Sequence, residues 1–332
     1  MSQALRSASN ERMGYPDPAG VPELRGSLAA YLARARGLHL SADQVIVTGG
    51  TRQGLLLTWR ALLGGDGRSV AIERPGWGGV AETAMDAGLT TIPIPVDEEG
   101  ILVEGLDCTR ADVVAVAPAH QYPTGSVLSA HRRAELVGWV RHGDRLIVED
   151  DYDAEYRYDR QPVGSLQGLE PERVLYLGST SKTLVPAIGV GWLVSPPRLT
   201  GPLVEAQRRS GGSPSPLHQL ALAYMIERGD LDRHLRAQRR RYARRRDLLL
   251  QSLARELPAA EVSGAAAGLY VTVKLAEGSD VRSVLATART RGLAVEGFID
   301  RSPALVLGYA NLHEAVVEEV VKALATCIRS VS

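Results

Sequence analysis

The residues best suited to chemistry stand directly after short apolar runs of the chain. In chain order they are Gly50-Thr51-Arg52, Trp77, Tyr122, Asp150 with Tyr152, and Ser179 and Ser181 with Lys182. Lysine is rare in this sequence, with three residues against 35 arginines. A partly desolvated lysine among polar groups is a plausible amine nucleophile, which makes Lys182 the candidate nucleophile of the set.

Together these groups match the demands of one kind of ligand. The backbone N–H groups of residues 50–52, at the start of a predicted helix, can bind an anion, and Ser179 and Ser181 add hydroxyl donors. Trp77 offers a flat face to an aromatic ring, and a carboxylate at a buried strand end can hold a positive ring nitrogen. With a lysine amine nearby, the set fits a phosphorylated, cationic aromatic aldehyde. Pyridoxal 5′-phosphate (PLP) answers that description.

Alternating strand and helix patterns indicate the scaffold that positions these groups. Helical stretches such as 51–63 and 130–142 separate several apolar runs, and a further helix is expected over 22–36. Several runs are continuous, as in strands buried on both faces, so we expect a mostly parallel α/β sheet whose ligands lie at the carboxyl ends of the strands. The seven expected strands are 45–47, 70–72, 91–94, 113–116, 146–148, 174–177 and 192–194.

A second, smaller unit is expected after a stretch rich in Gly, Ser and Pro at 208–216. A long arginine-dense helix is predicted over 217–253. Strands near 269–275, 293–295 and 305–307 and a last helix near 314–328 then complete an α+β unit. The expected organisation is an N-terminal arm (1–20), a large domain (21–208), and an interdomain helix with a small C-terminal domain (209–332).

Composition narrows the class of protein. The 332 residues balance 38 basic against 38 acidic side chains, which argues against a nucleic-acid partner. No apolar run reaches the roughly 18–20 residues that span a bilayer, so no membrane association is expected. Cys108 and Cys327, the two cysteines, cannot build a disulfide framework or a cysteine-rich zinc site. We therefore expect a cytoplasmic protein without a metal.

Four motifs, in this order, carry a resemblance to a known family: YPDPAGVPELR from residue 15, HQYPTG from 120, EDDYDAEY from 149 and STSKTLVP from 179. The chain resembles fold-type I PLP enzymes of the class I aminotransferase superfamily, and most closely the aminotransferase-like domain of MocR/GntR-type regulators. The resemblance implies a fold-type I PLP-dependent transferase: a mostly parallel seven-stranded sheet with helices on both faces and a smaller C-terminal α+β domain. It also implies a homodimer, here without the winged-helix DNA-binding domain.

The resemblance assigns roles to individual residues. Lys182 forms the Schiff base with PLP and acts as general base, Asp150 pairs with the pyridine nitrogen, and Tyr152 bonds the ring hydroxyl. These three are the implied catalytic residues. The other implied cofactor-binding residues are Tyr15 from the partner subunit, Gly50, Thr51, Arg52, Trp77, Tyr122, Ser179 and Ser181. His120 is left open between a role near the ring and a purely structural one.

Three positions depart from the family pattern. Gly189, Gly79 and Val306 stand where the family, or some of its members, carries an arginine. We hypothesise that Arg52 compensates for Gly189 at the phosphate. Without an arginine at 306, the usual fork that holds a substrate carboxylate is missing, which puts ordinary α-amino-acid transamination in doubt.

The sequence predicts an enzyme that acts on the amino group of a small amine or amino acid, most simply an aminotransferase. Three alternatives stay open: a PLP-dependent elimination or replacement enzyme, a PLP-binding sensor-like module with little turnover, and a degenerate fold that binds no PLP. The substrate and the amino acceptor are not defined by the residues.

Overall fold

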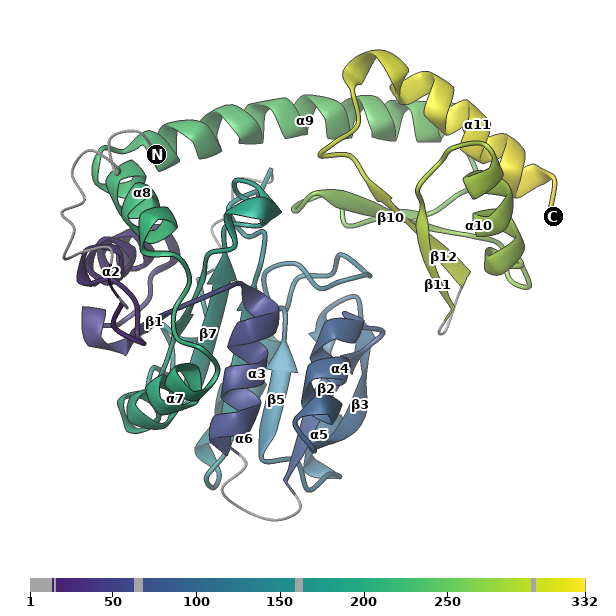
Figure 1. Ribbon diagram of the computed structural model, residues 1–332. Helices are drawn as coiled ribbons and strands as arrows, with labels where there is room; N and C mark the ends of the chain where they lie inside the picture. The colour runs from purple at the N-terminus through teal and green to yellow at the C-terminus, as the bar shows by residue number, and fades with distance from the viewer. Residues whose placement is uncertain (1–13, 15, 63–67, 159–163, 300–302, 332) are drawn as a thin grey trace. The chain divides into compact units, whose positions relative to one another are not determined.

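The computed structural model describes residues 14, 16–62, 68–158, 164–299 and 303–331 (Figure 1). The chain forms two compact units, which we describe separately. The first contains the described residues up to Gln121, those of Val127–Asp153, and those from 164 to His234. The second contains Tyr122–Ser126, Ala154–Tyr158 and the described residues from Leu235 onward. These units are defined by contacts within the fold, whereas the domain limits at residues 20 and 208 were predicted from sequence composition. Those two limits therefore stay predictions.

The first unit is built on an eight-stranded sheet in the order β1-β8-β7-β6-β5-β2-β3-β4. Its strands are β1 (Val45–Thr48), β2 (Ser69–Arg74), β3 (Thr90–Asp97), β4 (Gly100–Ile101), β5 (Val113–Val116), β6 (Leu146–Asp151), β7 (Val174–Ser179) and β8 (Gly191–Val194). Four neighbouring pairs are parallel and three are antiparallel, so the sheet is mixed and mostly parallel. All seven predicted strands are confirmed, and the prediction of seven was one short. Two-residue β4 carries too little pattern to be predicted.

Helices cover both faces of this sheet, and several pack where the sequence placed them. The helices of the unit are α2 (Pro22–Arg36), α3 (Thr51–Leu62), α4 (Gly78–Asp86), α5 (Glu104–Asp107), α6 (Ala130–Arg141), α7 (Pro197–Arg209) and α8 (Pro216–Glu227), with 3-10 turns η2 (Ala42–Gln44) and η3 (Pro186–Ile188). Helix α8 lies beside α2 (Figure 1). Helix α9 (Asp230–Glu256) begins in the first unit and ends in the second.

The strand pleat divides the core of the first unit into two apolar layers. On one face, Leu177 and Val148 pack with side chains of α3, α4 and α7. On the other face, Ile147 and Val114 pack with α6. Because successive side chains of a strand alternate between faces, even-numbered positions of β6 lie on the α3 side and odd-numbered ones on the α6 side. This alternation places Asp150 on the α3 side.

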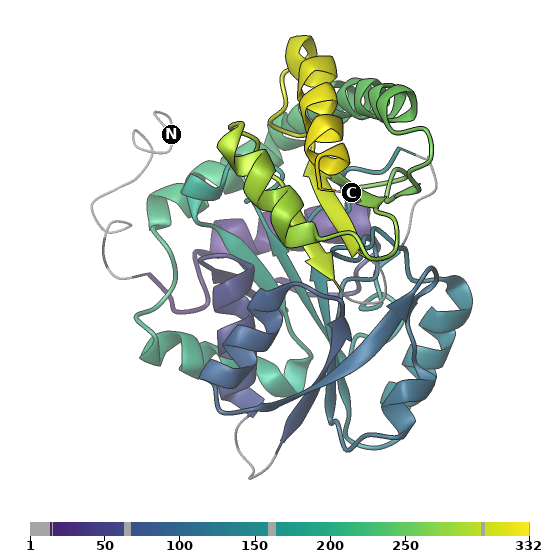
Figure 2. The ribbon, with the colours of Figure 1, turned by 90° about the vertical axis from the view of Figure 1, so that its right-hand side faces the viewer.

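The second unit is an antiparallel sheet backed by helices. The sheet has the order β11-β12-β10-β9. Its elements are β9 (Val262–Ser263), β10 (Tyr270–Lys274), α10 (Val281–Thr290), β11 (Glu296–Ile299), β12 (Pro303–Gly308), η4 (Glu314–Val316) and α11 (Val317–Arg329). Figure 2 shows α10 and α11 side by side against this sheet. Its core joins alternate residues of β10 and β12, such as Val271 and Leu305, to the apolar stripes of both helices.

Two predictions in this part of the chain were wrong in detail. The expected helix over 217–253 is two helices, because Gly229 adopts a left-handed φ of 68° between α8 and α9. The expected strand over 293–295 is not one. Gly292 (φ 74°) closes α10, and the Leu293 N–H donates to the Ala288 carbonyl at 3.0 Å, which fixes Leu293 at the helix end. The strand begins later, at Glu296.

Two features of the described residues bear on partners. None of the helices in this part of the chain is long and apolar enough to cross a membrane. Among the same residues, no three His, Cys, Asp or Glu side chains cluster as ligands for a metal ion.

Candidate cofactor site

The strand directions bring most of the predicted groups to one edge of the large sheet. Strand β8 runs antiparallel to both β1 and β7, so β1 and β7 point the same way. Strands β7, β6, β5 and β2 are parallel to one another. The carboxyl ends of β1, β2, β5, β6 and β7 therefore share an edge, and the residues that follow them emerge there.

Gly191 in β8 holds the ends of β1 and β7 close together. It is in register with Thr48 on one side and Ser179 on the other. A Cβ at this position would lie 2.7 Å from the Gly50 Cα and 2.9 Å from the Gly178 carbonyl oxygen. Only glycine permits this approach, which places the start of α3 beside the end of β7.

The start of α3 presents hydrogen-bond donors at this edge. Gly50 has a φ of 122°, a backbone conformation that favours glycine. The first bond of the helix is donated by the Gly54 N–H to the Gly50 carbonyl at 3.0 Å. The N–H groups of residues 51–53 precede that bond, as is usual in the first turn of a helix. This end of α3 can bind a phosphate group.

Ser179 and Ser181 lie at the end of β7, next to this helix start. Ser179 is buried, and its hydroxyl oxygen accepts the Ser181 N–H at 3.3 Å. Because that contact uses the oxygen as an acceptor, the Ser179 O–H is still able to donate. The two predicted serine ligands are thus brought together with the start of α3.

Arg52 contacts two other groups of the first unit. Its Nη1 lies 2.9 Å from Glu82 Oε2, and its guanidinium carbon lies 5.6 Å from the centre of the Trp77 ring. Both charged groups are exposed, so their ion pair is weak and exchangeable. A contact of Arg52 with phosphate stays a prediction. Gly189 has a φ of 59°, which explains why a glycine, and not an arginine, stands there.

Trp77 directly precedes α4, and its indole lies over the first turn of that helix. A Cβ at position 79 would lie 2.4 Å from Trp77 Cζ2. An arginine at Gly79 is sterically incompatible with this placement of the indole. Trp77 is 37% exposed, so one part of its ring is open to a ligand. Stacking of Trp77 on the cofactor stays a prediction.

Asp150 is the most unusual polar residue of the site. Its Oδ1 is buried and accepts no hydrogen bond from the part of the chain that the structure describes. Burial, and then the neighbouring charges of Asp151 and Asp153, raise the pKa of this carboxyl to about 7. A buried acceptor without a donor costs free energy, of the order of 1–3 kcal/mol. Asp150 is therefore poised for a donor that the described residues do not supply.

The acids on either side of Asp150 accept hydrogen bonds from the described residues, although Asp151 Oδ1 is also buried without a donor among them. Glu149 accepts two backbone N–H bonds at 3.0 Å each. Asp151 accepts from Arg36 Nε at 2.7 Å and from the Tyr176 hydroxyl at 2.6 Å. These contacts lie on the α6 side of the sheet, away from α3, so the two acids serve the fold.

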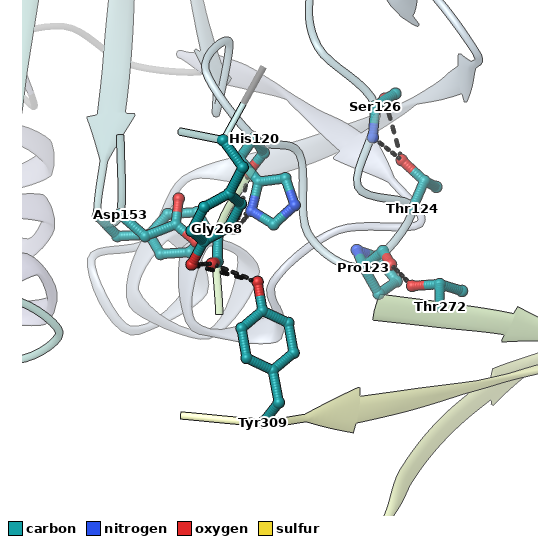
Figure 3. A network of polar contacts seen from close by, with 10 residues as sticks. His120, Pro123, Thr124, Ser126, Asp153, Gly268, Thr272 and Tyr309 are labelled. Carbon is teal, nitrogen blue, oxygen red and sulfur yellow. Dashed lines mark hydrogen bonds and ion pairs between the residues drawn. The ribbon is translucent and has the colours of Figure 1, made fainter. Parts of the chain in front are cut away.

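Tyr152 lies beside a histidine–aspartate pair. Its hydroxyl donates to the His120 main-chain oxygen at 2.7 Å. The His120 Nδ1 lies 2.9 Å from Asp153 Oδ2, and Figure 3 shows the two side chains facing each other. Asp153 belongs to the EDDYDAEY motif at the end of a predicted strand, but sequence reasoning gave it no role. Only the fold could show that it faces His120.

Lys182 lies in the turn that follows β7. The turn is fixed by Thr180, whose N–H and hydroxyl donate to the Val190 carbonyl at 3.0 and 2.8 Å, and by Leu184, whose N–H donates to the Thr180 carbonyl at 2.8 Å. The Lys182 side chain is exposed. Its backbone is thus held at the same sheet edge as Ser179 and Asp150.

Two predicted cofactor residues are not brought into this set. Tyr15 lies outside the described residues. Tyr122 belongs to the second unit, where its hydroxyl donates to the Glu296 carboxylate and its ring meets Tyr270 edge-on at 5.4 Å. Burial and the Glu296 carboxylate raise the pKa of Tyr122. Contacts of Tyr15 and Tyr122 with the cofactor stay predictions.

Glu73, at the end of β2, is a buried carboxyl to which the sequence prediction gave no role. Its Oε2 accepts the Ala117 N–H at 3.2 Å and lies 3.4 Å from the Gln121 amide nitrogen. Burial is the main reason that its pKa rises to about 8. The signal available in the sequence was its place at a strand end.

Comparison with known proteins places this geometry in a family. The model of the aminotransferase class I and II family matches residues 1–324. The chain therefore belongs to the aminotransferase class I and II family. One relative, the HTH-type transcriptional regulator YhdI of Bacillus subtilis, is 30% identical over 93% of this chain and 67% of its own. Another, the probable rhizopine catabolism regulatory protein MocR of Rhizobium meliloti, is 31% identical over 98% of this chain and 67% of its own.

A solved aminotransferase structure has nearly the same fold. The kynurenine aminotransferase of Pyrococcus horikoshii, solved in complex with PMP, superposes with a TM-score of 0.91 at 26% identity, over 99% of this chain and 85% of its own. The chain is a fold-type I, PLP-dependent aminotransferase-like enzyme whose reaction type is open.

The residues of this site fit PLP. The orphaned Oδ1 of Asp150 suits the N–H of a protonated pyridine ring. Gly50 and Gly191 approach each other closely and carry no side chains. The N–H groups at the start of α3 are therefore left open to a phosphate group. The donor set therefore matches both ends of the cofactor.

Proposed function

We propose that this chain transfers the amino group of a small amine or amino acid with PLP as its cofactor, most simply as an aminotransferase. The observation that carries the proposal is the buried Oδ1 of Asp150. Among the described residues it has no hydrogen-bond donor, and it lies on the side of the sheet covered by α3. An acceptor kept dry without a partner is expected where a ligand supplies the donor.

Each residue of the site would have one task. Bound PLP supplies an aldehyde carbon that combines with amines and a ring that withdraws electrons. Lys182 would hold the aldehyde and, once a substrate amine has replaced it, take the proton from the substrate carbon as general base. Asp150 would keep the ring nitrogen protonated, since a buried carboxylate and a cation stabilise each other. Tyr152 would bond the ring hydroxyl.

The remaining residues would bind and orient. Trp77 would cover one face of the ring, and Arg52 would exchange Glu82 for the phosphate. The phosphate would be bound by Gly50, Thr51, Ser179 and Ser181, with Tyr15 of the partner subunit completing the set in a homodimer. Tyr122 would lie near the ring as the residue before Pro-Thr-Gly.

A sensor-like module with little turnover is a second candidate. Two relatives at 30–31% identity bear the names of regulators, and Val306 stands where the resemblance places an arginine for the substrate carboxylate. Elimination or replacement at the substrate's β or γ carbon is a further outcome of the same residues. A cytoplasmic location and the absence of a nucleic-acid partner stay predictions from composition.

The test is an absorbance titration of purified protein with PLP and then with a panel of amines. For an aminotransferase, we expect a visible band of protein-bound cofactor that an effective amine removes, while the matching aldehyde or ketone appears in equal amount. Lys182→Ala should lose the band and Lys274→Arg, the matched control, should keep it. A stable band with no product from any amine would favour the sensor. The absence of PLP binding to wild-type protein would contradict both.

A further inference from the structure

A buried histidine–aspartate pair lies beside Tyr152 in the first unit. We propose that His120 and Asp153 are positioning residues that hold the Tyr152 phenol for the ring oxygen of PLP. The inference rests on the proposed role of Tyr152 and extends it to two residues with no assigned role. It is argued from three contacts, all within the first unit.

The first contact fixes the tautomer of His120. Its Nδ1 lies 2.9 Å from Asp153 Oδ2, and the two side chains are 0% and 1% exposed. A carboxylate can only accept, so His120 Nδ1 carries a hydrogen and donates it to Asp153. In the low-dielectric interior, where both side chains are buried, such a hydrogen bond is costly to break. Asp153 therefore pins the imidazole, and with it the backbone of residue 120.

The second and third contacts join that backbone to the phenol. The Tyr152 hydroxyl donates to the His120 main-chain oxygen at 2.7 Å and lies 3.4 Å from His120 Nδ1. Because Nδ1 already carries a hydrogen, it cannot accept from the phenol. The Tyr152 hydrogen therefore points at the His120 carbonyl, which fixes the orientation of the phenol. A shift of His120 would move the oxygen that fixes this orientation.

Asp153 also affects the site through its charge. It is one of the two acids whose charge raises the pKa of Asp150. The charge and the hydrogen bond can be separated by substitution. Asp153→Asn keeps an oxygen acceptor for His120 but removes the charge, whereas Asp153→Ala removes both.

The experiment is a double-mutant cycle on the dissociation constant of PLP, measured by ultrafiltration of the purified chain. We expect Tyr152→Phe and Asp153→Ala each to weaken PLP binding about tenfold, the size of one good hydrogen bond. The double variant should be within about twofold of Tyr152→Phe alone, because Asp153 acts through Tyr152. Asp153→Asn should bind PLP within about twofold of wild type.

Equal weakening by Asp153→Asn and Asp153→Ala would overturn the proposal in favour of charge. If Asp153→Ala weakens PLP binding by the same factor in the wild-type and in the Tyr152→Phe background, Asp153 has a merely structural role and the proposal is overturned. If Asp153→Ala does not fold, Asp153→Ser breaks the same bond with less loss of polarity. Cofactor binding does not require turnover, so a protein that binds PLP without transferring an amino group still tests this proposal while contradicting the proposed function.

Discussion

Substitution of Gly191 tests how the two ends of the cofactor site are held together. In Gly191→Ala, the new Cβ would lie 2.7 Å from the Gly50 Cα, 2.9 Å from the Gly178 carbonyl oxygen and 3.1 Å from the Gly50 nitrogen. All three atoms are backbone, so no flexible side chain can move aside. The start of α3 must then shift away from β8.

The magnitude follows from the crowding. Forcing one methyl group into a well-packed position costs about 1–3 kcal/mol. At this chain length that lowers the melting temperature by roughly 1–4 °C. The displaced N–H groups of α3 would also lose contact with phosphate, so PLP affinity should fall about tenfold or more.

The assays are thermal unfolding of the protein without PLP and a PLP binding titration. Gly26→Ala is the matched control, because it lies inside α2 and a Cβ there meets nothing within 4 Å. Alanine is the better helix former, so this variant should gain about 0.5–1 kcal/mol and bind PLP as wild type does. If Gly191→Ala keeps both the melting temperature and the PLP affinity, the reasoning about this contact is refuted.

Three further substitutions probe the same unit. The pKa of Asp150 is raised to about 7, so in the PLP-free protein this group adds stability at low pH that is lost as the pH rises from about 4 to about 7. Asp150→Asn should therefore flatten that part of a curve of unfolding free energy against pH. An unchanged curve would contradict the raised pKa of Asp150. Gly79→Ala should displace the Trp77 indole and weaken PLP binding several-fold with little change in melting temperature; unaltered binding would argue against stacking. Arg36→Met should destabilise the fold by about 3–5 kcal/mol in denaturant unfolding, because it leaves Asp151 buried without its cation; a much smaller loss would contradict the buried pair.

Much of the large unit could be predicted because its strands are continuous apolar runs. All seven predicted strands are confirmed, and the strand directions bring the residues after β1, β6 and β7 to one edge. The long helix and the strand over 293–295 were wrong because two glycines with left-handed backbone, Gly229 and Gly292, decide where helices end. Hydrophobic pattern alone does not show which glycines adopt that conformation.

The side-chain partners in the site could not be read from the sequence. Three successive acids, residues 149–151, look alike in the sequence. In the fold, Glu149 accepts two backbone N–H groups and Asp151 Oδ2 accepts two side-chain donors, whereas Asp150 Oδ1 is buried without a donor among the described residues. The pairing of His120 with Asp153 joins positions 33 residues apart. Such side-chain pairings depend on the packed fold and cannot be predicted from local sequence. The strand ends at which these residues lie can be predicted, because each follows a short apolar run.

The central claim is that PLP is held through Lys182. The most direct measurement is to load the purified protein with PLP, reduce it with borohydride, and locate the added mass by peptide mass spectrometry. Three lysines compete for this attachment: Lys182, Lys274 and Lys322. We predict one cofactor per chain on the peptide that contains Lys182. Attachment to either of the other lysines, or none at all, would contradict the account.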